Sequence, residues 1–404
     1  MVVSHCKLVA LTFEQARDCV LHEIGEGRAA STEQVPLLES AGRVLAEPIY
    51  ADRDYPPFPR SARDGFALRS ADLHGNPIRV IGEVRAGEMF PASIDSGEAV
   101  EIMTGAPLPD GADAVLMVEH ARRQDGCITT DRALRPGENF NPRGIEARAG
   151  SEILAPGKRI GYAEIALLAM VGRDRLSVYA KPRVAILPTG DEVVAITEQP
   201  REFQIRNSNL WSLAAQVARA GAVPELLPIA RDNYDATRAL AERGLQSDLL
   251  LLSGGVSAGK YDIVERVLAD LGAIFYFDRV LIQPGQPVVF GAVKDKFFFG
   301  LPGNPLSTMV TFELFARAAI EKLSGATDAP LPLLRAKLTR EFHHKTGLTR
   351  FLPALVSENG ATVTPQPWHG SGDISSLARA NAFLVSDADR ESWSAGDEIR
   401  VLLK

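Results

Sequence analysis

Apolar and polar residues follow two different patterns along the chain, and the change falls near residue 181. From 181 to about 328, short apolar runs such as 249–252 alternate with segments such as 210–218, whose apolar residues recur at helical spacing. A run that is apolar throughout is typical of a strand covered on both faces. This alternation predicts an α/β domain with a mostly parallel sheet, which a long helix from 305 to about 323 closes. Asn304 is expected to cap this helix, with Pro305 at its first position.

The flanking regions follow other patterns. Thr12 and Gln15 form a capping-box signature, which predicts a helix just after them. Residues 75–160 carry short apolar runs separated by glycine and proline, which predict a small β domain, and the residues after 328 predict a second one. Residues 161–172 predict a helix that Gly172 ends. We therefore expect a multidomain α/β plus β protein with an extended helical/β N-terminal region, a small β domain, the α/β domain (181–328) and a C-terminal barrel-like β domain (329–404).

Composition narrows the class of protein. The 404 residues include 44 Lys+Arg and 51 Asp+Glu, so the net charge of −7 disfavours nucleic acid as a partner. No apolar run approaches the roughly 20 residues of a membrane-spanning helix, and the start of the chain has no signal-peptide pattern. The three cysteines form no C-x-x-C pair. We therefore expect a cytoplasmic protein that binds no membrane.

The stretch "SGGVSAGKYD" (253–262) matches the start of a phosphate-binding P-loop through Gly254, Gly259 and Lys260. Tyr261 stands where a P-loop needs Ser or Thr, which argues against a nucleoside triphosphatase. Ligands of doubly wound sheets bind at the carboxyl ends of the strands. Four loops are expected at that edge, and their glycines and helix N-termini would favour an anion: 188–192, 230–235, 253–262 and 301–305.

Four acidic residues belong to these loops, namely Asp191, Glu192, Asp232 and Asp262. Carboxylates beside a phosphate site suggest Mg²⁺. Alternatively, Asp232 and Asp262 stabilise the starts of helices, and spacing alone does not decide between the two roles. By spacing alone, the segments around Asp64 and Thr104 are turns. No histidine pattern of a zinc enzyme and no nucleophile motif is present.

A series of motifs in fixed order resembles the molybdopterin molybdenumtransferase family, which comprises the MoeA proteins and the E domain of gephyrin. The motifs are "SARDGFA", "IMTGAPLPDGADAV", "RPGENFNPRGIEARAG", "ILPTGDEV", "IRNSN", "SGGVSAGKYD", "PGQP", "GLPGNPLS" and "GSGDISSLARANAF". The resemblance implies an enzyme that takes adenylylated molybdopterin and molybdate, inserts molybdenum with the help of Mg²⁺, and releases AMP. It also implies that the part before the α/β domain divides into a discontinuous extended dimerisation region (1–50 and 141–180) and a small β domain (51–140). The protein would thus be a homodimer, with the upstream adenylyltransferase as a further expected partner.

The resemblance also implies roles for single residues. Asp64, Asp232 and Asp262 would be catalytic, and Glu192, Asp232 and Asp262 would hold the metal. The remaining positions would bind substrate: Thr104, Ser253, Gly254, Gly255, Ser257, Arg279, Pro302, Pro305, Arg350 and Ser371. Gln283 and Gln286 depart from the family, because lysines commonly stand there. This departure leaves open the choice between molybdate and tungstate.

Two other functions remain to be weighed. A molybdopterin adenylyltransferase would share the "SGGVS" type of loop, but the large additional domains and the "MTGAP" motif argue against it. A non-catalytic scaffold of the same fold is the other alternative. The acids at positions 64, 192, 232 and 262 favour catalysis over a scaffold.

Overall fold

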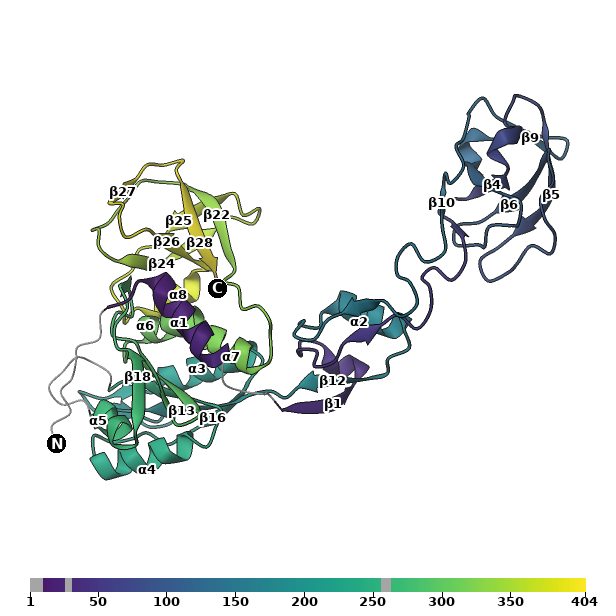
Figure 1. The fold of residues 1–404 in the computed structure, drawn as a ribbon. Coiled ribbons are helices and arrows are strands. Elements are labelled where there is room, and N and C mark those ends of the chain that lie inside the picture. The colour runs from purple at the N-terminus through teal and green to yellow at the C-terminus, as the bar shows by residue number, and fades with distance from the viewer. Residues whose placement is uncertain (1–9, 26–30, 256–262) are drawn as a thin grey trace. The chain divides into compact units, whose positions relative to one another are not determined.

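The computed structural model describes residues 10–25, 31–255 and 263–404 (Figure 1). The chain forms two compact units. The first comprises residues 1–46, 157–161 and 175–404, and the second comprises 47–156 and 162–174. The four-part division of the chain expected from the sequence stays a prediction.

A six-stranded sheet forms the centre of the first unit. Its order is β16 (Val223–Leu226), β13 (Arg183–Pro188), β17 (Leu249–Ser253), β21 (Lys296–Leu301), β20 (Val289–Val293) and β18 (Ala273–Phe277). The first four strands pair in parallel, and β20 pairs antiparallel with both of its neighbours, β21 and β18. The prediction of an α/β domain with a mostly parallel sheet is confirmed.

Both faces of this sheet are covered by helices, as the apolar run at 249–252 requires. Leu249 and Leu251 pack into the core on one face, while Leu250 and Leu252 pack into the core on the other. The first core is shared with α1 (Phe13–Gly25), α3 (Ser208–Arg219), α6 (Pro305–Thr311) and α7 (Arg317–Leu323). The second core is shared with α4 (Tyr234–Gly244) and α5 (Ile263–Asp270) (Figure 1).

Two predicted helix starts had different outcomes. The capping box before α1 is confirmed, because the Thr12 amide donates to Gln15 Oε1 (3.0 Å) and the Gln15 amide donates to Thr12 Oγ1 (3.2 Å). Asn304 precedes α6 with Pro305 in the first turn, but the Asn304 side chain makes no capping hydrogen bond. The expected single helix also contains a π-helical turn, Phe312–Ala316, between α6 and α7.

A closed five-stranded barrel forms the C-terminal part of the first unit, as expected. Its strands are β24 (Thr349–Val356), β25 (Thr362–Pro365), β22 (Leu333–Leu338), β28 (Glu398–Leu403) and β26 (Ala382–Ser386), and pairing of β24 with β26 closes it. Helix α8 (Ile374–Arg379) and the short pair β23 (Phe342–His343) and β27 (Ser392–Trp393) flank the barrel. Strand β19 (Ile282–Gln283) runs parallel to β24, so a segment of the α/β region joins the barrel sheet.

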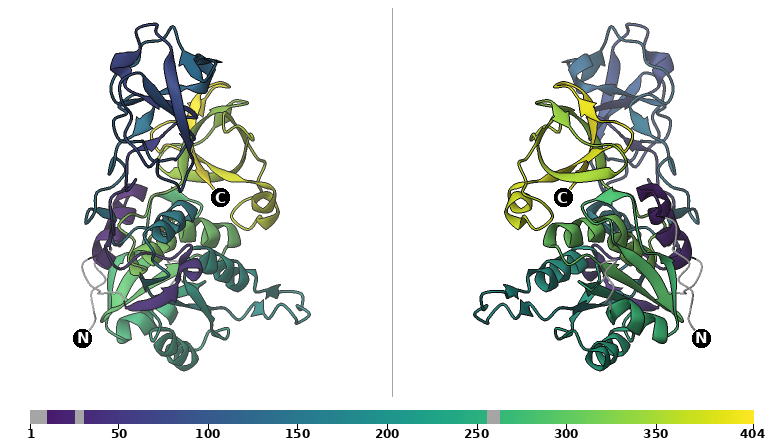
Figure 2. Two further views of the ribbon diagram at one scale, coloured as in Figure 1. Left: turned by 90° about the vertical axis from the view of Figure 1, so that its right-hand side faces the viewer. Right: turned by 90° about the vertical axis from the view of Figure 1, so that its left-hand side faces the viewer.

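Smaller strand pairs complete the first unit. Strands β1 (Thr32–Pro36) and β12 (Arg175–Tyr179) pair antiparallel next to the 3-10 turn Leu37–Ser40. Strands β14 (Val193–Val194) and β15 (Ile205–Arg206) form the base of an arm, which projects from the α/β domain (Figure 2). Three apolar side chains on this arm are exposed: Ile196, Phe203 and Ile205.

The second unit is built on another six-stranded sheet with apolar cores on both faces. The order is β7 (Ala114–Met117), β4 (Gly65–Leu68), β6 (Glu98–Ile102), β5 (Ile78–Val84), β9 (Cys127–Thr129) and β8 (Arg122–Gln124). Two short pairs and a helix complete it: β2 (Ile49–Tyr50) with β11 (Glu152–Leu154), β3 (Arg60–Ser61) with β10 (Phe140–Asn141), and α2 (Tyr162–Met170).

Helix α2 ends just before Gly172, whose φ of 73° is the left-handed conformation that ends many helices. The sequence predicted this helix and its glycine stop. Among the helices of the described residues, none has the length and apolar character needed to cross a membrane.

Candidate active site

A pocket of about 690 Å³ lies at the carboxyl ends of β13, β17 and β21. Backbone hydrogen bonds join its loops: the Thr189 amide donates to the Ser253 carbonyl (3.0 Å), and the Gly190 amide donates to the Ala230 carbonyl (3.1 Å). All four loops expected at this edge contribute to the pocket. Seven of the predicted site residues line it: Glu192, Asp232, Ser253, Gly254, Gly255, Pro302 and Pro305.

The turn after β17 has room for glycine only. Gly254 and Gly255 have φ of 93° and 68°. A Cβ on Gly254 would lie 2.9 Å from Thr189 Oγ1, and one on Gly255 would lie 2.7 Å from Val264 Cγ2. The turn thus brings bare backbone to the pocket wall, which suits an anionic group. The Gly254 amide donates to the Leu301 carbonyl (3.1 Å), so a ligand at the turn would have to bind to backbone groups other than this amide.

Two asparagines of the "IRNSN" motif line the pocket, although the sequence interpretation gave neither of them a role. Asn209 Nδ2 donates to Ser253 Oγ (2.9 Å) and to the Gly303 carbonyl (2.8 Å), so it joins α3 to two of the loops. Asn207 Oδ1 caps α3. Asn207 Nδ2 and Asn209 Oδ1 are buried without a partner in the described structure. Buried polar atoms are rarely left unpaired, so these two point to a bound polar ligand.

Glu192 and Asp232 line the pocket, and Asp191 lies next to Asp232; we call these three residues the acidic corner. The Asp232 amide donates to Asp191 Oδ1 (3.1 Å). Partial burial and the charges of Asp191 and Glu192 raise the pKa of Asp232. Gly190 leaves room for the Glu192 carboxylate, because a Cβ at position 190 would lie 2.5 Å from Glu192 Oε2. The acidic corner therefore carries like charges that a cation would relieve.

The helix-start alternative for Asp232 is not supported, because Asn233 is the residue that caps α4. Its Oδ1 accepts a hydrogen bond from the Ala236 amide (3.0 Å). The described residues include no group of three or more His, Cys, Asp or Glu suited to a metal. Mg²⁺ commonly takes one or two carboxylates together with water and phosphate, so Glu192 and Asp232 fit such an ion. Asp262 and Ser257 lie outside the described residues.

Family comparisons cover most of the chain. Residues 11–172 match the MoeA N-terminal region (domain I and II), 185–322 match the probable molybdopterin binding domain, and 335–404 match the MoeA C-terminal region (domain IV). The molybdopterin molybdenumtransferase of Bacillus subtilis (strain 168) is 36% identical over 401 residues, which is 96% of this chain and 92% of that protein.

The chain belongs to the molybdopterin molybdenumtransferase family. The enzyme of that name from Nostoc sp. (strain PCC 7120) is 33% identical over 385 residues, which cover 92% of this chain and 88% of that protein. A solved structure of a molybdopterin biosynthesis MoeA protein from Pyrococcus horikoshii OT3 has a TM-score of 0.80 and 29% identity. The match covers 98% of this chain and all of that one.

A second group of polar residues lies in the barrel, and we call Arg350, His344 and Ser386 the arginine cluster. Arg350 is 5% exposed, and its guanidinium donates to the Lys345 carbonyl (3.0 Å). Ser386 lies opposite Arg350 on β26. Within the described part of the chain, Arg350 Nε, His344 Nδ1 and Ser386 Oγ are buried and have no hydrogen-bond partner.

The charge of Arg350 is poorly compensated. Burial lowers the pKa of Arg350. Burial and the charge of Arg350 lower the pKa of His344, so His344 is neutral at pH 7. No ion pair of Arg350 is present among the described residues. A buried cation without an acid partner is costly, and a bound anion would remove that cost.

The "QPGQP" stretch connects the arginine cluster to the pocket within the same unit. Gln283 pairs with Arg350 across the β19–β24 ladder, and Pro287 lines the pocket. The Ser371 carbonyl accepts a hydrogen bond from the Leu306 amide (2.9 Å), which attaches the segment before α8 to the start of α6. Arg279 is exposed and does not line the pocket.

Asp64 and Thr104 contact each other in the second unit. Asp64 Oδ1 accepts hydrogen bonds from the Thr104 amide (2.6 Å) and the Thr104 hydroxyl (2.9 Å). These bonds lower the pKa of Asp64, so it is ionised at neutral pH. Spacing alone predicted two turns, and the structure brings these turns together although 40 residues separate them. The catalytic role of Asp64 stays a prediction.

Proposed function

We propose that this protein transfers molybdenum from molybdate to adenylylated molybdopterin and releases AMP. Its family makes it a transferase of molybdenum cofactor biosynthesis. The observation that carries the proposal is that the glycine turn at Gly254 and Gly255 lines the same pocket as Glu192 and Asp232. A phosphate held at the turn would thus lie beside carboxylates that can bind its counter-ion.

Each part of the site has a task in this proposal. Glu192 and Asp232 would hold Mg²⁺, which when bound supplies positive charge to the phosphate oxygens. Asn207 Nδ2 and Asn209 Oδ1, which are unpaired in the described structure, would form hydrogen bonds with the substrate. Arg350, with Ser386, would hold molybdate through charge-assisted hydrogen bonds, and the "QPGQP" stretch would bring the oxyanion towards the pocket.

We also propose that the protein works as a homodimer. Large apolar side chains are exposed on the arm and on the neighbouring surface of the α/β domain, where a second copy would cover them. They include Phe203, Ile205, Trp211 and Val223. The adenylyltransferase that makes the substrate is proposed as a further partner, because direct transfer would protect a reactive intermediate.

The proposal is tested with purified protein, adenylylated molybdopterin, molybdate and Mg²⁺, by measuring released AMP. We expect AMP release to fall strongly in Asp232→Asn and to persist in Asp235→Asn. Asp235 is the matched control, because it is an exposed aspartate three positions along that does not line the pocket. ATP-dependent adenylylation of free molybdopterin, without molybdate-dependent AMP release, would instead support the adenylyltransferase alternative.

A further inference from the structure

The start of α3 lies in the wall of the active-site pocket, where Asn207, Ser208 and Asn209 line it. The first backbone N–H groups of a helix have no partner inside the helix, and they carry a partial positive charge. Helix α3 is 12 residues long, so its aligned peptide dipoles end in this wall. A helix start so placed offers hydrogen-bond donors to an anion in the pocket.

The side chain of Asn207 adds a buried donor at the same place. Asn207 is 5% exposed, and its Oδ1 accepts a hydrogen bond from the Leu210 amide (3.1 Å). Because a backbone amide can only donate, this bond identifies the oxygen of the side chain and leaves Nδ2 as its free end. Nδ2 is buried and has no partner within the described residues. A buried donor without a partner is costly, so a ligand with an acceptor oxygen would stabilise it.

These donors share one end of one helix. A capping side chain folds over the first turn, so Asn207 Nδ2 lies at the same helix end as the amides of Ser208 and Asn209. The Leu210 amide is used by the cap, whereas the Ser208 and Asn209 amides have no hydrogen bond in the described part of the chain. Three donors at one helix end match the oxygens of a phosphate, which accept hydrogen bonds.

The charge next to this helix start is positive. Among the described residues that line the pocket, Arg206 is the single cationic side chain, and it directly precedes Asn207. Its guanidinium donates to the Glu198 carbonyl (3.1 Å) and to the Gln199 side chain (3.3 Å), neither of which carries a negative charge. The positive charge of Arg206 thus adds to the dipole of α3 in favouring an anion.

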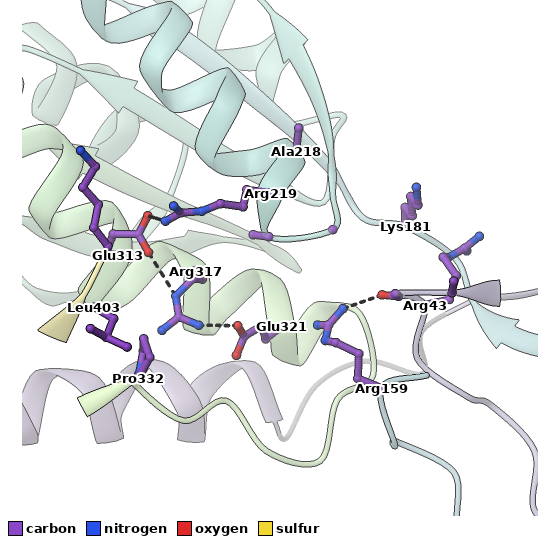
Figure 3. A pocket seen from close by; sticks show the side chains of 15 residues that line it. Arg43, Arg159, Lys181, Ala218, Arg219, Glu313, Arg317, Glu321, Pro332 and Leu403 are labelled. Carbon is purple, nitrogen blue, oxygen red and sulfur yellow. Dashed lines mark hydrogen bonds and ion pairs between the residues drawn. The ribbon is translucent and has the colours of Figure 1, made fainter. Parts of the chain in front are cut away.

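Helix α3 is held at both ends. At its start, Asn209 Nδ2 donates to Ser253 Oγ (2.9 Å) and to the Gly303 carbonyl (2.8 Å). Near its end, Arg219 donates to Glu313 Oε1 (2.6 Å), as Figure 3 shows. The Asn209 side chain therefore holds the start of α3 next to the glycine turn. Two anion-binding elements joined by one side chain suit two phosphates that share an oxygen.

We propose that Asn207 Nδ2 and the first amides of α3 form a phosphate subsite distinct from the glycine turn. The pocket would then hold both phosphates of a pyrophosphate link, one at α3 and one at the turn. This inference rests on the proposed function, because adenylylated molybdopterin carries such a link. Asn209 Oδ1 is an acceptor and does not bind an ionised phosphate, so it would face an N–H or O–H group of the substrate.

The test is isothermal titration calorimetry of the full chain with Mg²⁺ present, with AMP and molybdopterin titrated separately. Each of these ligands carries one of the two phosphates. Asn207→Asp keeps an oxygen to cap α3 but replaces the free donor with a negatively charged acceptor. Asn207→Ser also keeps a capping residue and removes Nδ2 without adding charge.

Two further variants complete the set. Asn233→Asp is the matched control, because Asn233 caps α4 in the same way and does not line the pocket. It adds the same negative charge as Asn207→Asp. Gly255→Ala alters the glycine turn, where a Cβ would lie 2.7 Å from Val264 Cγ2. Melting temperatures confirm that each variant is folded.

We expect Asn207→Asp to raise the Kd of one ligand about tenfold and Asn207→Ser to raise it about threefold, with little change in Asn233→Asp. Gly255→Ala should weaken the other ligand. If Asn207→Asp weakens AMP, the adenylyl phosphate lies at α3, and if it weakens molybdopterin, the pterin-side phosphate lies there.

The inference is overturned if Asn207→Asp weakens neither ligand or both equally, or if Asn233→Asp has the same effect. It is also overturned if Gly255→Ala weakens the same ligand as Asn207→Asp, or if the unaltered protein binds neither. The titrations contain no molybdate, so they are separate from the test of the proposed function. Binding in the expected pattern without molybdate-dependent AMP release would contradict the proposed function and leave the two subsites in place.

Discussion

The acidic corner and the arginine cluster lie in the same unit and are opposites in charge. In the acidic corner, partial burial and the neighbouring charges of Asp191 and Glu192 raise the pKa of Asp232. In the arginine cluster, the charge of Arg350 is buried without an acid, and the pKa of His344 is lowered. The acidic corner therefore has an excess of negative charge, and the arginine cluster has an excess of positive charge.

Among the residues that the structure describes, side chains of the protein itself leave the charges of both groups incompletely compensated. Each imbalance destabilises the folded protein alone and is relieved by a ligand of the opposite charge. Such a trade of stability for function is common at active sites. In the proposed function, Mg²⁺ would bind at the acidic corner and the molybdate oxyanion would bind at the arginine cluster.

Replacing Arg350 should have the largest effect. Arg350→Met removes the uncompensated cation and keeps a long apolar stem, so we expect molybdate-dependent AMP release to fall about 100-fold. The melting temperature should stay the same or rise, because the buried charge is removed. Arg335→Met, on an exposed position of β22, is the control and should leave activity unchanged. A melting temperature that fell sharply together with activity would show that Arg350 is structural.

Asp232→Asn tests the acidic corner. The folded-state pKa of Asp232 is raised, so folding is penalised once the pH has risen through that pKa, and the penalty persists at neutral pH. Removing the charge should lower activity about 30-fold but raise the melting temperature by about a degree or two in the absence of Mg²⁺. Addition of Mg²⁺ should stabilise the unaltered protein more than the variant. Equal stabilisation of both would contradict a metal role for Asp232.

Gln283→Lys would move the chain towards the common family sequence. Gln283 pairs with Arg350 across the strands, so a lysine adds a second cation at the oxyanion site. We expect molybdate affinity to rise about tenfold and the unliganded protein to become less stable. Titrations with molybdate and tungstate would show whether the glutamine sets the preference between them. If the affinity for both oxyanions is unchanged, residue 283 does not contribute to oxyanion binding.

His344 should produce the smallest effect, which depends on pH. Because its pKa is lowered in the folded state, protonation destabilises the protein as the pH falls through the usual range of histidine. A bound oxyanion would favour protonated His344, so molybdate affinity should rise about threefold between pH 7.5 and 5.5. His344→Gln should remove that dependence. If the variant shows the same pH dependence of molybdate affinity, that dependence arises from a group other than His344.

The regular part of the fold was predictable from the sequence because hydrophobic pattern and capping act locally. The run 249–252 specified a strand buried on both faces, and Thr12 with Gln15 specified the start of α1. The π-helical turn at Phe312–Ala316 was not predictable, because no local signal distinguishes it from α-helix. The absence of a capping hydrogen bond from the Asn304 side chain was not predictable either, because a favourable residue type does not fix the side-chain rotamer.

The site was predictable in part. Loop order along a parallel sheet placed Glu192, Asp232 and the glycine turn together, as the pocket shows. The arginine cluster depends on pairing between strands far apart in sequence, so Ser386 could not have been linked to Arg350 by spacing. Asn207 and Asn209 could have been noticed in the sequence, because two asparagines separated by one residue precede the predicted helix 210–218. Their spacing alone did not show which groups they contact.

The central claim is that one protein couples metal insertion to cleavage of the adenylyl group. The most direct measurement is a single-turnover reaction with adenylylated molybdopterin, Mg²⁺ and limiting molybdate, in which AMP and molybdenum bound to molybdopterin are both quantified. The account predicts equal amounts of the two products and no AMP without molybdate. AMP release that is independent of molybdate, or that occurs without bound molybdenum, would contradict it.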